Sequence, residues 1–154
     1  MDKLSKDELY SIATKMQLHD IIRFCETNKV INEKICGRND IWYFLLKRDF
    51  SNDSELFNFI VSPNKTYIFL YSLNKFKNKY FPTKDYPNET LLDIYNKKEI
   101  YLSYRNLKEV PKIIPYLTNL QILYLHNNEI KEIPESLSNL INLKELYLSD
   151  NQIK

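Results

Sequence analysis

Two histidines and two cysteines carry the most reactive side chains, and their spacing argues against a catalytic or metal site. His19 and His126 have no ligand or catalytic partner at a useful spacing in the sequence. Cys25 and Cys36 lie 11 residues apart, without the C-x-x-C spacing or the nearby histidine pair of a zinc site. We therefore expect a protein that is not an enzyme, with no metal, no cofactor and no disulfide framework.

The chemistry that the sequence does favour is aromatic binding. Tyr101, Tyr124 and Tyr147 recur at intervals of 23 residues, and exposed tyrosines are enriched at protein interfaces. At the same interval they are flanked by Glu99, Ile122 and Glu145 on one side, and by Ser103, His126 and Ser149 on the other. The alternative is that the tyrosines only cover backbone. The predicted target-binding residues, on a concave face, are Tyr101, Tyr124, Tyr147, Ile122, His126, Glu99 and Glu145.

The tyrosines lie within a repeated segment. The stretches 120–130 and 143–153 both fit L-x-x-L-x-L-x-x-N-x-L and are 23 residues apart. This pattern resembles the leucine-rich repeat, which stacks parallel strands and offers a binding surface. Because side chains alternate along a strand, Leu123 and Leu125 should point inward while Tyr124 points outward.

Further copies extend this segment to residues 97–154. Counting back 23 residues gives a degenerate first repeat, with Lys97 in place of the opening leucine and Arg105 in place of the asparagine. The third repeat is incomplete at Lys154, so we expect about two and a half repeats. We predict that Asn128 and Asn151 hydrogen-bond backbone groups where the chain leaves each strand. An open edge at 146–148 predicts weak self-association.

The remainder of the chain reads as helical. Apolar residues at spacings of three and four predict short helices over residues 1–50. The sequence predicts a helical linker over residues 51–96. One of its helices begins at Pro63, and a short one runs from Thr90 to Asn96. The predicted fold class is therefore α plus α/β, with a helical N-terminal segment followed by a short solenoid of parallel strands.

The first 50 residues carry a second resemblance. The opening Leu4-Ser5-Lys6-Asp7-Glu8-Leu9, the apolar helix from Leu18 to Cys25 and the helix from Ile41 to Phe50, with Trp42, are similar to the F-box. The resemblance covers about residues 3–50. Together with the repeats, it makes the chain similar to the F-box-like/leucine-rich-repeat proteins of giant DNA viruses.

That resemblance implies a substrate receptor of a Skp/cullin/F-box-type ubiquitin ligase. The F-box-like part would bind a Skp-type adaptor protein, and the repeats would bind a target protein. The alternative for Leu4, Leu9 and Ile21 is ordinary core packing against residues 54–76. The positions that match the adaptor-contacting residues of the family are Leu4, Ser5, Leu9, Leu18, Ile21 and Ile22.

Charge and hydropathy limit the classes of partner that we expect for this protein. The net charge is +2, and only Lys75, Lys77 and Lys79 hint at a basic face, which we interpret as solvated rather than as a nucleic-acid site. The apolar runs are too short to span a membrane, and no secretory signal precedes the helices, so we expect a cytoplasmic protein, in the host cell if it is viral.

Two alternatives to the ligase receptor follow from the same residues. The first is a plain leucine-rich-repeat binding module whose helical part is only an N-terminal cap. The second is a ligase enzyme with a catalytic cysteine; Cys25 precedes Glu26, but it lies on an expected apolar helix face and little chain remains for such a domain.

Overall fold

A computed structural model describes residues 6–13, 15–17, 20–21, 23, 26, 33, 36–59 and 62–154. The chain divides into two compact units, Met1–Tyr71 and Ser72–Lys154. The boundary falls inside one helix, α5 (Pro63–Tyr80).

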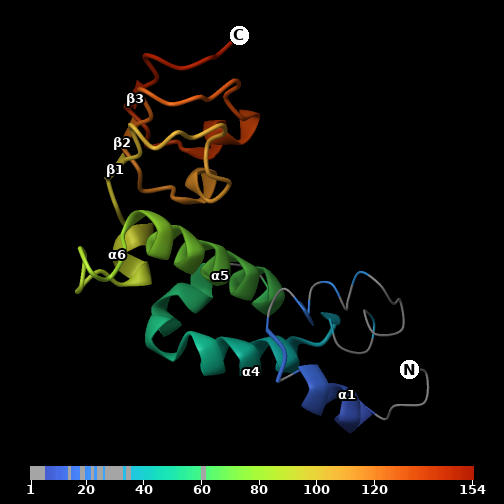
Figure 1. Ribbon diagram of the computed structural model, residues 1–154. Coiled ribbons are helices and arrows are strands. Elements are labelled where there is room, and N and C mark those ends of the chain that lie inside the picture. Colours follow the sequence, from blue (N-terminus) through green and yellow to red (C-terminus); the bar gives the residue numbers. More distant parts are fainter. Residues whose placement is uncertain are drawn as a thin grey trace. The chain divides into compact units, whose positions relative to one another are not determined.

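The first unit is helical, as the sequence predicts. It contains α1 (Lys6–Ala13), α4 (Asn39–Asp49), the 3₁₀ segment η2 (Ser51–Phe59) and the first half of α5 (Figure 1). In α4 an aspartate lies in the first turn and two basic residues lie in the last, an arrangement that complements the helix dipole.

An aromatic cluster lies in the core of the first unit. The Tyr67 ring centroid lies 5.7 Å from that of Trp42 and 5.4 Å from that of Phe50. The indole nitrogen of Trp42 donates a 2.8 Å hydrogen bond to the Cys36 carbonyl. The Tyr67 hydroxyl donates to the carboxylate of Asp49. Around this cluster, the side chains of Ile21, Ile41, Leu45, Leu46, Leu56 and Leu70 are fully buried.

One sequence expectation is wrong in this unit. The cysteine spacing indicated no disulfide, whereas Cys36 is disulfide-bonded. The separation of two residues along the chain does not exclude their meeting in space, so the spacing argument could not settle the point.

The second unit begins with two helical pieces. The second half of α5 is followed by α6 (Leu91–Tyr95), which confirms the short helix predicted after residue 90. A capping box begins α6: the Asp93 backbone N–H donates to the Thr90 hydroxyl over 3.1 Å, and the Thr90 N–H donates to the Asp93 carboxylate over 2.8 Å. The hydrogen bonds from Thr90 lower the pKa of Asp93.

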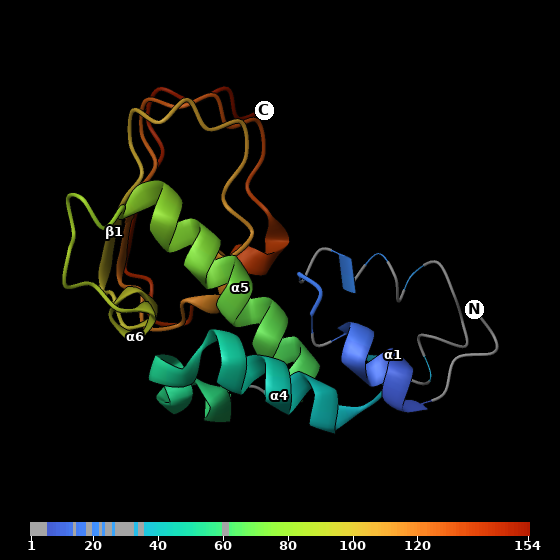
Figure 2. The ribbon, with the colours of Figure 1, turned by 60° about the horizontal axis from the view of Figure 1, so that its bottom comes forward.

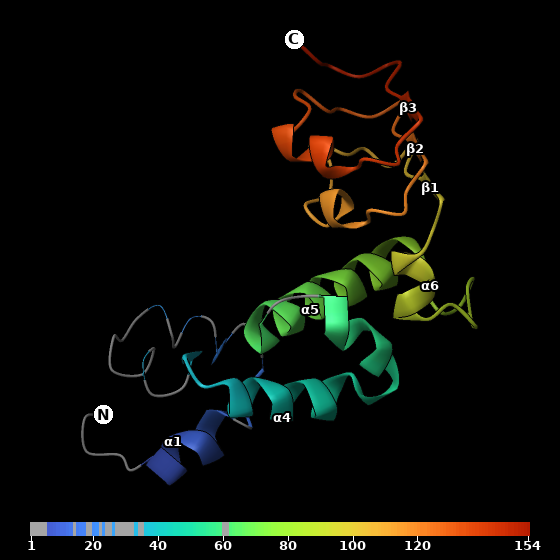
Figure 3. The ribbon, with the colours of Figure 1, turned by 180° about the vertical axis from the view of Figure 1, so that it is seen from behind.

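Three coils then stack in the order of the sequence. Their strands are β1 (Glu99–Tyr101), β2 (Ile122–Tyr124) and β3 (Glu145–Tyr147), paired in parallel in the order β1-β2-β3. The 3₁₀ turns η3 (Ile114–Tyr116) and η4 (Glu135–Asn139) lie across the coil from the strands (Figures 1 and 3). In Figure 2 the successive coils overlie one another. Helices and a small parallel sheet are thus as predicted.

The register of the strands repeats every 23 residues. Ile100 pairs with Leu123 and Leu123 with Leu146. The inward side chains of the first two coils, Ile100, Leu102, Leu123 and Leu125, are completely buried. Each such burial stabilises the fold by about 1.5–3 kcal/mol. The corresponding leucines of the third coil, Leu146 and Leu148, are only half-buried, because β3 has a single neighbouring strand.

The predicted asparagines hydrogen-bond the turns that follow the strands. The Asn128 side-chain oxygen accepts from the backbone N–H groups of Arg105 and Leu107 at 3.1 and 3.0 Å. Its nitrogen donates to the carbonyls of Leu102 and Leu125 at 2.9 and 2.8 Å. One coil later, the Asn151 oxygen accepts from the Ile130 N–H, and its nitrogen donates to the carbonyls of Leu125 and Leu148. The prediction for both residues is confirmed.

Among the described residues, none of the helices combines the length and the apolar character that crossing a membrane requires.

Candidate functional site

The outward face of the three strands carries a stack of tyrosine rings, which we call the tyrosine strip (Tyr101, Tyr124 and Tyr147). The ring centroids of Tyr101 and Tyr124 are 4.3 Å apart with planes 8° from parallel, and those of Tyr124 and Tyr147 are 4.7 Å apart at 6°. This spacing follows from the distance of roughly 4.8 Å between neighbouring strands. Tyr101 is 59% exposed and Tyr147 is 43% exposed, so the strip presents a wide aromatic surface.

Carboxylates on the same strands hold the two outer rings. The Tyr101 hydroxyl donates a 2.8 Å hydrogen bond to Glu99, and the Tyr147 hydroxyl donates to Glu145. Each carboxylate lies two residues before its tyrosine and therefore on the same face of the strand. These hydrogen bonds raise the pKa of both phenols. The outer rings are thereby fixed before any partner arrives.

A histidine borders the strip on its other side. The Nδ1 atom of His126 lies 2.9 Å from the Ser103 hydroxyl oxygen, across neighbouring coils. A serine beside a histidine can form a nucleophile–base pair when a third group orients the histidine. Within the described part of the chain no carboxylate bonds the His126 ring, so this contact serves to link two coils.

Tyr104 extends the aromatic surface and was missed by the sequence reasoning. Its ring meets the His126 ring edge-on, with centroids 5.5 Å apart, and its side chain is 71% exposed. Tyr104 has φ 60°, and the residues 23 and 46 positions later, Asn127 and Asp150, have φ 55° and 56°. The repeat could have revealed this turn position, but not that an aromatic side chain would occupy it.

The structure brings the predicted target-binding residues together. The three tyrosines form the strip, and the strand register aligns Glu99, Ile122 and Glu145 as the neighbouring column. Ile122 and His126 are half-buried, whereas both glutamates are exposed.

The predicted adaptor-binding residues are only partly within the described structure. Leu4, Ser5, Leu18 and Ile22 lie outside the described residues, as do His19 and Cys25. Leu9 belongs to α1. Ile21 is 1% exposed, and a side chain buried to this extent offers no surface to a partner unless the segment rearranges.

No cluster of three or more histidine, cysteine or acidic residues that could hold a metal ion occurs in the part of the chain that the structure describes. The chemistry available on the strand face is therefore that of aromatic rings, carboxylates and one imidazole.

Comparisons with known proteins agree with the geometry of the coils. Neither the curated proteins nor the solved structures yield a match to this chain. A family model described as leucine rich repeat matches residues 96–153. That range takes in all three strands and both 3₁₀ turns between them. Such repeats typically serve as non-enzymatic interaction domains, and the match supports a leucine-rich repeat over residues 96–153 of this chain.

Proposed function

We propose that this protein is a non-enzymatic interaction adaptor that holds a target protein on the tyrosine strip. The observation that carries the proposal is the stack of three nearly parallel tyrosine rings, two of them more than two-fifths exposed. Stacking and the hydroxyl–carboxylate bonds restrict these rings in the free protein, so binding loses little side-chain entropy. Rigid aromatic anchors of this kind are the commonest source of binding energy in interfaces.

The charge of the face indicates the chemistry of the target. Glu99 and Glu145 border the strip, and each carboxylate can accept more hydrogen bonds than the one from its tyrosine. An arginine or lysine of the target could lie over a tyrosine ring and bond a glutamate. We therefore expect the target segment to carry at least one basic side chain.

Paired affinity purifications test the target proposal. The full chain, a Tyr101→Ala/Tyr147→Ala variant and a Tyr116→Ala control are compared by quantitative mass spectrometry. Tyr116 is 60% exposed but lies on η3, away from the strands. A target should be recovered equally by the wild type and the control, and at least tenfold less by the double variant. If every captured protein binds all three equally, the strip is not the binding site.

We further propose that the protein is a substrate receptor of a Skp/cullin/F-box-type ubiquitin ligase. Residues 1–50 would bind the Skp-type adaptor and residues 97–154 would hold the target. Residues 51–96 would be the helical linker between these two parts. The support is the resemblance of the first 50 residues to the F-box together with the interaction role of the repeats. A receptor of this kind works in the cytoplasm, in the host cell if the protein is viral.

Binding of purified Skp-type adaptor to the full chain tests this second proposal. Wild type should bind, and Leu9→Asp/Ile22→Asp should not, because charges then replace apolar contacts. The Tyr101→Ala/Tyr147→Ala variant should keep adaptor binding while losing the target. Trp42 fluorescence, which reports on the first unit, shows whether the Leu9→Asp/Ile22→Asp variant is folded, and far-ultraviolet circular dichroism shows it for the tyrosine variant. If the folded wild type does not bind the adaptor, the ligase role is refuted, whereas the proposal of target binding is unaffected.

A plain repeat module is the second candidate function, and one observation favours it. Ile21, one of the six positions matched to adaptor contacts, is buried within the first unit. In this alternative the helical segment is a structural cap, and only the tyrosine strip binds a partner. The adaptor experiment separates the two candidates.

A further inference from the structure

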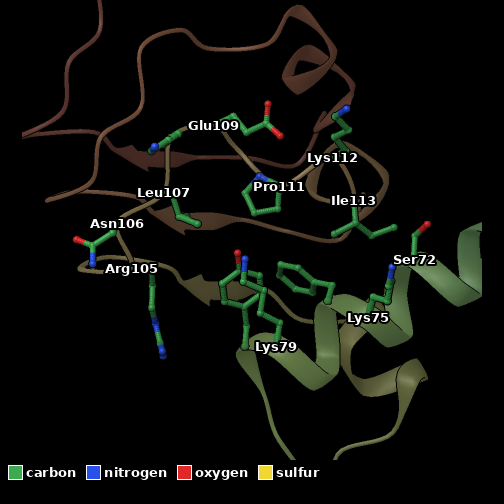
Figure 4. A pocket seen from close by; sticks show the side chains of 13 residues that line it. Ser72, Lys75, Lys79, Arg105, Asn106, Leu107, Glu109, Pro111, Lys112 and Ile113 are labelled. Atoms are coloured by element: carbon green, nitrogen blue, oxygen red, sulfur yellow. The ribbon is translucent and has the colours of Figure 1, made fainter.

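The second unit contains a groove away from the tyrosine strip. Its volume is about 660 Å³, and it lies between the second half of α5 and the segment 105–113 (Figure 4). This volume falls within the range of sites that enclose a small ligand or a short peptide anchor, roughly 300–1,000 Å³. All of its lining residues belong to the same compact unit.

The groove is lined mainly by apolar groups. Phe76 on α5 and Leu107 and Ile113 on the facing segment are buried at 4%, 7% and 7% exposure. In Figure 4 Leu107, Pro111 and Ile113 lie on the segment that faces α5, which carries Lys75 and Lys79. Such a lining accepts one or two apolar side chains of a partner.

The rim of the groove is strongly basic. Five of the lining residues are cationic and one, Glu109, is anionic. The chain as a whole carries a net charge of only +2, so the groove concentrates positive charge. Cations from both walls of the groove would face an occupant. They are Lys75, Lys79, Arg105, Lys108 and Lys112, all exposed.

We propose that this groove binds an acidic peptide segment of a protein partner, one that places an apolar side chain on the floor and carboxylates against the rim. The charge of the rim selects the acidic flanks, and the apolar lining selects the anchor. The site is separate from the tyrosine strip, whose flanking glutamates favour a basic target. The protein would thus hold two different segments at once.

The lining favours a peptide over a nucleic acid. Proteins that bind single strands stack bases on accessible aromatic faces, in addition to neutralising phosphates. Stacking needs an open ring face, whereas an apolar anchor needs only the edges of side chains that line a groove. Phe76 and Tyr80, the two aromatic residues in the groove, are only 4% and 7% exposed and offer no open face. The three lysines that we interpreted as a solvated face do not act as one surface. Lys75 and Lys79 line the groove, whereas Lys77 does not.

Selection from a displayed library of random peptides tests the proposal on the full chain. Selected peptides should be enriched in sequences with aspartate or glutamate on both sides of a leucine, isoleucine or phenylalanine. A selected peptide is then synthesised and its dissociation constant is measured by fluorescence polarisation. Replacing its acidic residues by amides, or its apolar anchor by alanine, should weaken binding at least tenfold.

Matched charge reversals locate the site. Lys75→Glu/Lys112→Glu places a carboxylate on each wall and should weaken the peptide at least tenfold, because each reversal replaces attraction by repulsion. Lys131→Glu/Lys144→Glu changes the net charge equally at exposed positions outside the groove and should leave affinity within about twofold. Circular dichroism confirms that both variants are folded.

Three results would overturn the proposal. They are a selection that yields no acidic consensus, equal losses in both charge-reversed variants, or a labelled single-stranded RNA that binds more tightly than the best peptide and competes with it. Loss of target binding in the tyrosine-strip variant bears only on the proposed function, since that variant leaves the groove unchanged.

Discussion

Asn128 shows how a single polar residue can determine the shape of a coil. Together with Thr66 it is one of two buried polar or charged residues among those described, at 8% exposure. Its amide uses both its oxygen and its nitrogen to bond four backbone groups in two successive coils. An aspartate could not donate and a leucine could do neither, so the position requires asparagine chemistry.

Replacing Asn128 by alanine should therefore lower the stability of the fold substantially. The backbone N–H groups of Arg105 and Leu107 and the carbonyl of Leu102 would lose this partner, whereas the Leu125 carbonyl keeps its bond from Asn151. We expect a loss of about 2–4 kcal/mol in the free energy of unfolding. Urea unfolding followed by far-ultraviolet circular dichroism measures it. Asn119→Ala is the matched control, because the Asn119 side chain is exposed and bonds the exposed side chain of Asn96, and it should cost less than about 0.5 kcal/mol. Equal effects of the two substitutions would contradict the role of Asn128.

The Glu99–Tyr101 pair predicts a pH effect at the residue scale. The hydrogen bond to Glu99, with a further contribution from Tyr124, raises the pKa of Tyr101. A phenol whose pKa is higher in the folded protein stabilises the fold below its unfolded pKa of about 10, and this contribution disappears as the pH rises through the raised value. In Glu99→Ala the pKa of Tyr101 should fall towards about 10 in a spectrophotometric or NMR titration. Glu109→Ala removes a carboxylate outside the strip and should leave the pKa of Tyr101 unchanged.

At the scale of elements, Tyr67 joins α5 to α4 within the first unit. Its ring packs on Trp42 and Phe50, and its hydroxyl bonds Asp49, the last residue of α4. Burial and this hydrogen bond raise the pKa of Tyr67. Burial acts to raise the pKa of Asp49, but the hydrogen bonds from Arg48 and Tyr67 outweigh it and the pKa is lowered.

Tyr67→Phe keeps the ring contacts and removes only the hydroxyl. We expect it to lower the free energy of unfolding at pH 7 by about 1–2 kcal/mol, which denaturant titration followed by Trp42 fluorescence measures. Because the pKa of Asp49 is depressed, its stabilising contribution exists above about pH 3.9 and is lost as the pH falls through the lower folded value. The difference between wild type and Tyr67→Phe should therefore shrink in acid. Tyr43→Phe, at a residue 53% exposed on α4, should have little effect at any pH.

At the scale of the whole molecule, the outer edge of β3 is the site where a second copy could pair. β3 has one neighbouring strand in the sheet, and Leu146 and Leu148 behind it are half-buried. We predict weak self-association through this edge, visible as a sedimentation coefficient that rises with concentration. Leu146→Asp/Leu148→Asp should sediment as a monomer, whereas Ile141→Asp, at a residue 84% exposed outside β3, should associate like the wild type. A wild type that remains monomeric at high concentration would rule the edge out.

Periodicity let the sequence predict several features that recur every 23 residues. Leu123 and Leu125 are inside, Tyr124 is outside, and Asn128 bonds the backbone, because each was inferred from its alternation or repeated position. Contacts between segments that do not resemble each other in sequence could not be predicted from the repeat. Lys75 and Lys112 meet at one groove although nothing in their spacing connects them, and Tyr104 occupies a repeated turn position with a side chain that does not repeat.

The in-register pairing of the strands has a consequence for how such a chain can change in length. Glu99, Ile122 and Glu145 stand directly beside one another with no offset, so each strand pairs with the next in the same register. Gain or loss of a single residue within a strand would turn its leucines outward and its tyrosine inward. Duplication of an entire 23-residue segment would instead preserve each strand's pairing and lengthen the aromatic stack by one ring. A change in length that keeps this surface intact therefore involves a whole coil rather than a single residue.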